Sequence, residues 1–320
     1  MDKKKYIICI NNGGLGNRLK GLISVMRLSK KLERELVLYW PNTKYCGCDF
    51  EDLFENTLPK IGDEELKKIK RGGDYKFYND VLDNEHEKYK YLLFKTWRFI
   101  FLPNEVPKNF TKVFPSKEGR SIDFEFDRIP LDKRKDFLEE LNSLKPTQQI
   151  LEGVKSFEEK YNLSEYNGIH IRRGDTKFTV DGREKVSSDE LFIEKIKSMP
   201  NERFLLCTDG IETENKLKEL FGDKIIVYPK GDRKRSRKDS LQEALIDMLL
   251  LSKTKRLLGS YLSTFTELAW WFGGCKNKIE IIGIENVNKS PTSKTFLQKI
   301  VRKLKFYKVN FLRWIFRSYK

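Results

Sequence analysis

The stretch YNGIHIRRGD, residues 166–175, places the six-residue segment YNGIHI directly before two arginines, a glycine and an aspartate. Its first six residues are typical of a buried β-strand, and Gly174 permits a sharp turn after it. In open α/β sheets, ligands bind beyond the carboxyl ends of the strands. Arg172 and Arg173 would suit a diphosphate there, because a guanidinium presents a planar fork of donors to phosphate oxygens.

A solvated charge run is the alternative interpretation of two adjacent arginines. The position at a strand end, with His170 and Asp175 on either side, favours a functional site. Asp175 can hold one of the arginines in place. The stretch therefore indicates an anion site at the end of a central strand.

Outward from this strand, apolar runs alternate with helical patterns. Further strands are predicted at 203–207, 224–228, 256–259 and 279–282, and helices at 187–198, 212–221, 239–252 and 264–272. Another α/β unit is predicted upstream: a strand at 6–11, a helix reaching residue 33 and a strand at 36–40. Residues 43–130 have mixed periodicity, and two helices at 132–144 and 147–161 connect the halves. We expect an α/β protein with two domains, 1–150 and 151–288, and a C-terminal tail, 289–320.

A glycine loop, NNGGLGNRL at residues 11–19, follows the first predicted strand. Glycines let a backbone approach a ligand, and the N-terminus of the next helix favours an anion. The candidates are Gly14, Gly16, Asn17 and Arg18. The loop is neither a P-loop nor a dinucleotide fingerprint, which needs glycine where Leu19 stands. A tight turn that packs the helix on the sheet is the alternative.

Polar side chains follow two later strands. Ser260, Ser263 and Thr264 precede a predicted helix, where they can cap it or donate to a phosphate. Asp209 follows the strand at 203–207 and is a candidate for catalysis, nucleotide binding or helix capping. Asp247 lies inside an apolar helix, and the adjacent N–H donors of a guanine edge would satisfy its buried carboxylate.

The composition excludes several classes of protein. A hydrophobic fraction of 39% is too high for a disordered chain. Two histidines and five scattered cysteines argue against a metal site, and the odd, scattered set of cysteines suggests a reducing compartment. The N-terminal apolar run is too short for a signal peptide, and no run is long enough to span a membrane. We expect no metal and no cofactor.

The order of the motifs in this chain resembles that of GDP-fucose-dependent fucosyltransferases. The motifs are the glycine loop, HIRRGD, the later Thr208-Asp209, and the helix around Asp247 followed by SYLSTF. The nodulation-type α1,6 enzymes are most similar, with kinship to α1,2 and protein O-fucosyltransferases. The likeness covers roughly residues 6–40 and 165–285. It implies a GT-B fold, with two Rossmann-like domains facing a cleft, and inverting, metal-independent transfer of L-fucose from GDP-β-L-fucose to a glycan.

The resemblance also implies roles for single residues. Arg172 would hold the β-phosphate and stabilise the leaving GDP, as a charge placed where negative charge develops. Arg173 and Asp175 would order the loop. The remaining donor-binding candidates are His170 at the nucleotide, Asp247 at guanine, Ser263 and Thr264 at the diphosphate, Asn17 and Arg18 over the sugar, and Gly14, Gly16, Asp209 and Ser260.

The sequence departs from the family pattern after the motif aspartate. Nodulation-type and core α1,6 enzymes have a lysine there, and this chain has Thr176 with Lys177 next. The base that deprotonates the acceptor is unassigned, with Asp181 and Glu184 as nearby candidates.

The net charge of +16 sits mainly in two places. Residues 289–320 carry ten basic and no acidic residues, and the basic loop, residues 230–238, carries six basic residues and one aspartate. The tail has the pattern of an amphipathic helix on an anionic membrane, so we expect a cytoplasmic, peripherally membrane-associated protein. A helix packed on the N-terminal domain is the alternative. We expect the basic loop to be a solvated surface loop near the cleft.

Two other functions remain open. One is a GT-B transferase that uses another nucleotide sugar. The other is a nucleic-acid-binding protein, which would need basic residues interleaved with aromatics on the globular domains. Because the charge excess lies in one tail and one loop, we expect no nucleic-acid partner.

Deleting residues 289–320 should move the protein from the membrane fraction to the soluble fraction, because each basic residue near an anionic surface contributes about 1 kcal/mol. Fractionation of cells expressing the full-length and truncated chains measures this. Unchanged partitioning would contradict the membrane hypothesis.

Overall fold

The computed structural model describes residues 4–78, 82–95, 99–100, 102, 104–105, 131–174 and 186–284. Asp175, Asp181, Glu184 and the basic tail, 289–320, lie outside the described residues. Contacts divide the chain into two units, Met1–Ile284 and Glu285–Lys320. Both predicted α/β domains fall in the first unit, and their division at residue 150 stays a prediction.

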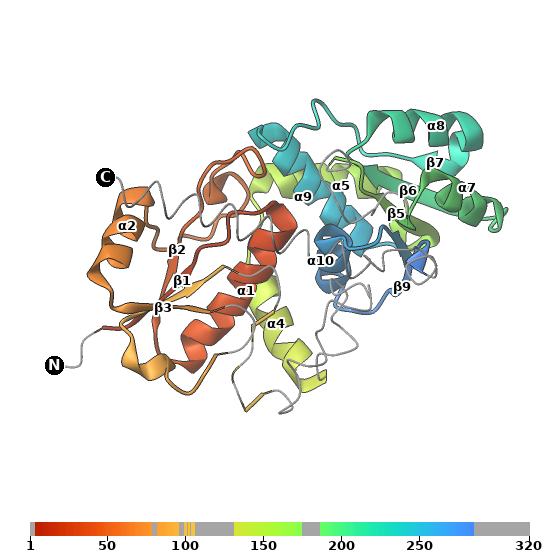
Figure 1. Ribbon diagram of the computed structural model, residues 1–320. Coiled ribbons are helices and arrows are strands. Elements are labelled where there is room, and N and C mark those ends of the chain that lie inside the picture. The colour runs from red at the N-terminus through yellow and green to blue at the C-terminus, as the bar shows by residue number, and fades with distance from the viewer. Residues whose placement is uncertain are drawn as a thin grey trace, which may run out of the picture. The chain divides into compact units, whose positions relative to one another are not determined.

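The N-terminal half contains a four-stranded parallel sheet in the order β2-β1-β4-β3 (Figure 1). Its strands are β1 (Tyr6–Cys9), β2 (Glu35–Leu38), β3 (Tyr75–Tyr78) and β4 (Tyr91–Phe94), and its helices are α1 (Leu15–Lys31) and α2 (Asp63–Gly72). Leu19, Leu22 and Ile23 of α1 are buried, so its apolar face forms the core with β1 and β4. The predicted first α/β unit is confirmed.

The C-terminal half contains a five-stranded parallel sheet in the order β7-β6-β5-β8-β9. Its strands are β5 (Tyr166–Ile171), β6 (Arg203–Thr208), β7 (Ile225–Ile226), β8 (Arg256–Gly259) and β9 (Lys278–Ile281), and its helices are α7 (Asp189–Lys197), α8 (Ile211–Phe221), α9 (Lys238–Ser252) and α10 (Thr264–Phe272). Every residue of β5 is buried, as expected for the central strand. Buried side chains of α7 and α8 share one core with Ile169 and Ile171, and those of α9 and α10 pack with Leu205 and Cys207. Helices thus cover both faces of this sheet.

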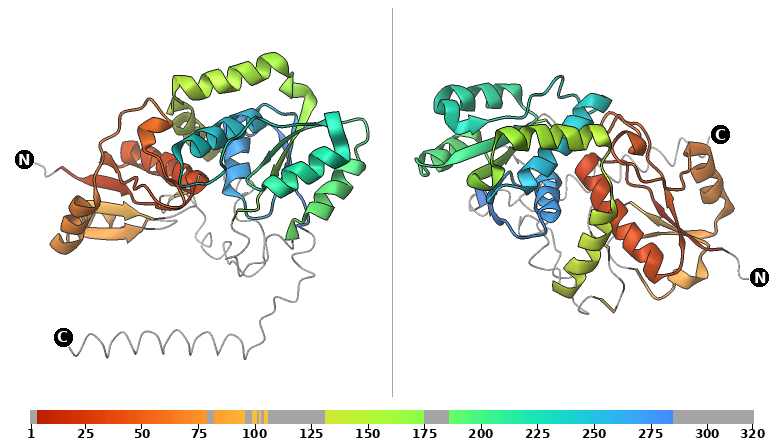
Figure 2. Two further views of the ribbon diagram at one scale, coloured as in Figure 1. Left: turned by 90° about the horizontal axis from the view of Figure 1, so that it is seen from above. Right: turned by 180° about the vertical axis from the view of Figure 1, so that it is seen from behind.

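Two helices connect the halves, α4 (Leu131–Ser143) and α5 (Gln148–Lys160), close to the predicted bounds. Figures 1 and 2 show α4 beside α1 and α10, and α5 beside α9. Short 3-10 helices occur at Phe50–Asp52, His86–Lys88, Leu163–Glu165 and Gly222–Lys224. One hydrophobic core therefore runs from the first sheet to the second.

The sequence did not predict α2, β3 or β4. Each strand has four residues, and β3 forms the edge of its sheet, where only Tyr78 of its side chains is buried. All three elements lie in the stretch 43–130, where the periodicity is mixed, and β4 pairs with the distant β1 while β3 pairs with β4, so tertiary contacts determine these strands.

A fully buried ion pair joins α1 to α10. The Lys20 Nζ lies 2.8 Å from an Oε2 of Glu267, and neither side chain is exposed to solvent. The Lys20 ammonium also lies 4.8 Å from the ring centroid of Phe99. Each charge is far from water and depends on its partner, so the pair holds the two helices together.

Glu267→Gln should lower the free energy of unfolding by about 3–5 kcal/mol, because it leaves the Lys20 ammonium buried without its counter-charge. Denaturant titration followed by circular dichroism measures this. Glu64→Gln, which breaks the exposed pair with Lys67, is the control and should change it by less than about 1 kcal/mol. Similar losses in both variants would contradict the assignment.

Candidate functional site

A pocket lies between the two halves, beyond the carboxyl end of β5. The predicted residues that line it are Gly14, Gly16, Asn17, His170, Arg172, Asp209, Asp247 and Thr264. Residues that were not among the predicted site residues complete the wall: Leu15, Tyr45, Thr208, Lys230, Arg233, Arg235, Ser240, Leu241, Ala244 and Phe265. Segments far apart in the sequence therefore build one site.

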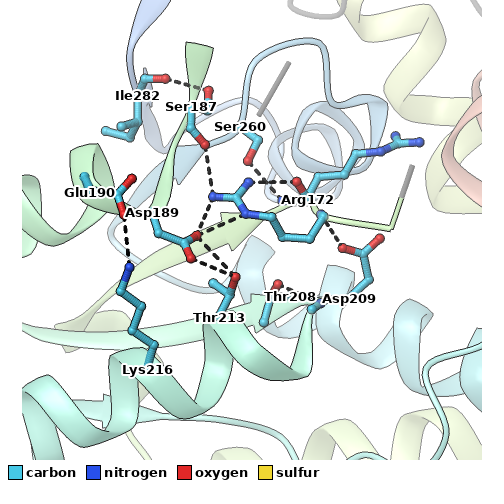
Figure 3. Close-up of polar contacts among 12 residues, drawn as sticks. Arg172, Ser187, Asp189, Glu190, Thr208, Asp209, Thr213, Lys216, Ser260 and Ile282 are labelled. Carbon is cyan, nitrogen blue, oxygen red and sulfur yellow. Dashed lines mark hydrogen bonds and ion pairs between the residues drawn. The ribbon is translucent and has the colours of Figure 1, made fainter. Parts of the chain in front are cut away.

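Arg172 and Arg173 point in opposite directions from the end of β5. The backbone N–H of Arg172 donates to the Ser260 Oγ at 3.0 Å, and the Arg172 side chain extends away from the polar network on the other side of the turn (Figure 3). Arg172 lines the pocket, whereas Arg173 does not. Ser260 is buried and supports the turn from below.

Arg173 is bonded into the body of the C-terminal half. Its Nε and Nη2 donate to Asp189 Oδ1 at 3.0 and 2.5 Å, and Nη2 also donates to the Ser187 carbonyl. The Thr213 hydroxyl donates to the same carboxylate (Figure 3). Arg173 therefore fixes the turn that presents Arg172.

Asp209, at the end of β6, bonds two arginine segments at once. Its Oδ1 accepts the backbone N–H of Arg173 at 2.6 Å, and its Oδ2 accepts Nη2 of Arg235 at 2.7 Å. Burial opposes ionisation of the carboxyl, but these donors outweigh it and lower the pKa of Asp209. Asp209 is a negative charge that organises the positive groups around it.

His170 is buried against α10. Its ring stacks on Phe265 with centroids 4.5 Å apart, and Nδ1 lies 2.7 Å from the Thr266 Oγ1 and 3.2 Å from the Ser263 Oγ. Burial lowers the pKa of His170 to about 3, with Arg172 among the groups that reinforce the shift and Asp209 opposing it. The imidazole is neutral at pH 7.

The glycine loop packs against the N-terminus of α10. A Cβ on Gly16 would lie 2.9 Å from the Thr264 Oγ1, and the Thr264 hydroxyl donates to Asn17 Oδ1 at 2.7 Å. Ser263 is the N-cap of α10, with its Oγ accepting the Thr266 N–H. Gly16 thus allows the two halves to approach closely, and it also lines the pocket.

Arg18 lies elsewhere than expected. Its side chain is fully buried beneath the glycine loop, where it donates to the carbonyls of Gly13 and Pro41 and stacks over Trp40. It does not line the pocket. Its contacts hold the loop in place from inside the N-terminal half, because a guanidinium can bond several carbonyls at once.

Asp247 forms a buried pair with Lys230 of the basic loop. Asp247 Oδ2 lies 2.8 Å from the Lys230 Nζ, and both side chains are less than a tenth exposed. Burial raises the pKa of Asp247, and the ammonium opposes the rise by favouring the carboxylate. Among the described residues, Oδ1 of Asp247 has no hydrogen-bond partner, so this wall of the pocket presents a buried acceptor.

The basic loop is not the solvated loop expected from its sequence. Lys230, Arg233 and Arg235 turn inward and pair with Asp247, Glu214 and Asp209. Lys234, Arg237 and Lys238 are exposed. The acids that attract the inward residues follow β6 or lie on α8 and α9, so the charge run alone could not reveal the pairing.

Within the part of the chain that the structure describes, no three His, Cys, Asp or Glu side chains gather where a metal ion could bind. None of the described helices combines the length and apolar character needed to cross a membrane.

No family model and no curated protein match the sequence. Among solved structures, NodZ α-1,6-fucosyltransferase co-crystallised with GDP matches at 15% identity, covering 83% of this chain and 92% of that chain, with a TM-score of 0.53. NodZ soaked with GDP-fucose matches at 15% identity, covering 84% of this chain and 93% of that chain, with a TM-score of 0.53. Another matching NodZ structure is from Bradyrhizobium. A mutant of Arabidopsis thaliana FUT1 in complex with GDP matches at 18% identity, covering 87% of this chain and 70% of that chain, with a TM-score of 0.52.

The chain has the fold of NodZ. The predicted α/β class, with two parallel sheets of the GT-B type, is confirmed by this likeness and by the observed topology. The predicted C-terminal helix lies outside the described residues.

The neutral state of His170 makes stability depend on pH. Because the folded pKa is lowered to about 3 from a usual 6.5, the unfolded chain binds the proton first, and stability should fall as pH drops from about 6.5 toward 3, by up to about 1.4 kcal/mol per pH unit. His170→Asn, which retains a polar atom near the Thr266 hydroxyl, should flatten this dependence. Denaturant titrations at pH 7, 6 and 5 give the free energy of unfolding of the wild type and of His170→Asn. The same pH dependence in both proteins would contradict the prediction.

Proposed function

We propose that the protein is a fucosyltransferase that moves L-fucose from GDP-β-L-fucose to a hydroxyl of a glycan acceptor. The fold likeness to NodZ, solved with GDP and with GDP-fucose, supports this class of donor. The observation that carries the proposal is the pocket, which combines Arg172 at a strand end with the buried acceptor of Asp247.

Asp247 is proposed to bind the guanine base. Guanine presents two adjacent N–H donors, one from its ring and one from its amino group, to a carboxylate. Oδ1 of Asp247 is buried without a hydrogen-bond partner in the described structure, and such an atom is costly unless a ligand supplies a donor. Adenine and uracil do not offer this pair of donors, so Asp247 would set the preference for GDP.

Arg172 is proposed to hold the diphosphate and to stabilise the leaving GDP. The bond between fucose and the β-phosphate breaks with negative charge developing on the phosphate oxygens, and a guanidinium in place before the reaction stabilises that charge. Thr264 lines the same pocket, with Ser260 and Ser263 buried behind it. In this proposal the acceptor oxygen attacks from the opposite face, which inverts the anomeric centre, and the arginine supplies the charge without a metal.

The remaining assignments are also proposals. The domain of residues 1–150 would bind the acceptor and that of 151–288 the donor, with Gly14, Gly16 and Asn17 reaching the donor from the first domain. Arg173 and Asp175 would order the phosphate-binding turn. Asp181 and Glu184 stay candidates for the acceptor base, and the tail would attach the protein to a membrane facing the cytoplasm.

Asp247→Asn should lower the preference for GDP over UDP by about 10- to 100-fold, the value of a hydrogen bond to a charged group. Isothermal titration calorimetry with GDP, UDP and ADP measures the affinity ratios, which do not depend on the folded fraction. Asp239→Asn, on the exposed side of the same helix, is the control and should keep the wild-type ratio. Equal binding of GDP and UDP by the wild type would refute guanine recognition.

Arg172→Ala should abolish transfer of fucose from GDP-fucose to acceptor sugars while the protein stays folded by circular dichroism. Near-normal turnover in this variant would remove Arg172 from the donor site.

A further inference from the structure

We propose that Arg235 of the basic loop is a second diphosphate-binding arginine, held in the pocket beside the Arg172 turn by Asp209. The inference rests on the proposed function only in that the ligand is a nucleoside diphosphate. It adds a binding residue that comes from a different loop than the HIRRGD motif.

The Asp209 carboxylate connects the two segments. One oxygen accepts the backbone N–H of Arg173 at 2.6 Å, and the other accepts the Arg235 guanidinium at 2.7 Å. Arg235 and Asp209 side chains are each about a quarter exposed, and both line the pocket. The carboxylate therefore orients Arg235 at the wall where β5 ends.

Gly174 shows how closely Arg235 approaches the turn. A Cβ on Gly174 would lie 2.5 Å from the Asp209 Oδ2 and 2.9 Å from the Arg235 Nη2. The guanidinium thus lies directly against the residues that follow Arg172. A side chain at position 174 would displace the carboxylate or the guanidinium, so glycine permits the two arginines to share one wall.

The backbone of Arg235 is held from the other half of the protein. The Gly47 N–H donates to the Arg235 carbonyl at 2.8 Å, and a Cβ on Gly47 would lie 2.3 Å from the Ser236 carbonyl oxygen. The basic loop is therefore fixed at both ends of Arg235, by a carboxylate on its side chain and by the N-terminal half on its backbone. A guanidinium with so little freedom loses little entropy when it binds a phosphate.

The pocket has more cationic than anionic side chains. Four cationic and two anionic side chains line it, and Glu214, outside the lining, compensates Arg233, which leaves a surplus of one positive charge that favours an anionic ligand. Lys230 is committed to Asp247 deep in the pocket, and Arg233 bonds Glu214 of α8 at 2.5 Å. Arg235 is the loop cation whose partner also bonds the motif turn, so it is the one placed to share a diphosphate with Arg172.

The test compares GDP, GMP and guanosine on the full chain. Calorimetry gives the GDP and GMP affinities, and competition against GDP gives that of guanosine. Arg235→Ala should lower the affinity for GDP by about 10- to 100-fold, which is the contribution of hydrogen bonds to a charged group. The affinity for guanosine should stay within about twofold of the wild-type value. Arg235→Lys keeps the charge but not the planar fork, so its GDP affinity should lie between those of the wild type and Arg235→Ala. Arg237→Ala, an exposed arginine of the same loop, is the matched control and should bind GDP as the wild type does.

Unchanged GDP affinity in Arg235→Ala would overturn the inference, and so would an equal loss of GDP and guanosine, which would indicate a general disturbance of the pocket. If the wild type prefers UDP, the proposed function fails, and the same variants measured with UDP and uridine decide the role of Arg235. If the wild type binds no nucleoside diphosphate, both proposals fail.

Discussion

The close contact between the N-termini of α1 and α10 determines the geometry of the pocket. Gly16 allows Thr264 to approach without a clash, and the Asn17–Thr264 hydrogen bond and the buried Lys20–Glu267 pair continue the contact along both helices. Both helix N-termini, each with a positive end of the helix dipole, consequently meet at one place. Glu267 in the first turn of α10 is neutralised by Lys20, and α1 has no acidic residue in its first turn, so nothing from these helices repels an anion.

The turn after β5 divides two identical side chains between two tasks. Arg173 is bonded to Asp189, to the Ser187 carbonyl and to the Arg172 carbonyl, so its donors serve the fold. Arg172 lines the pocket, where a ligand can reach it. The two side chains thus serve different purposes although they are neighbours in the chain just after β5.

The sequence predicted the fold where a pattern was local. β5 and α10 have the predicted bounds, because a short strand-like segment that ends in a turn and a capped helix can each be recognised within a few residues. β3 and β4 went unrecognised, since they lie in a stretch of mixed periodicity and β4 pairs with the distant β1. The site followed the same rule. His170 and Asp247 were found from their neighbours in the chain, whereas the inward turn of Arg235 depends on an acid 26 positions away.

Charge pairing explains why a strongly basic loop can form the wall of a pocket. Each inward cation has a carboxylate contributed by the second sheet or its helices, which offsets the cost of removing it from water. His170 meets the same buried environment without a carboxylate bonded to its ring, and it responds by losing its proton, as the lowering of its pKa to about 3 shows. The positive charge of the pocket thus comes from groups that stay ionised through the neutral range, while the imidazole contributes a flat, uncharged surface beside Phe265.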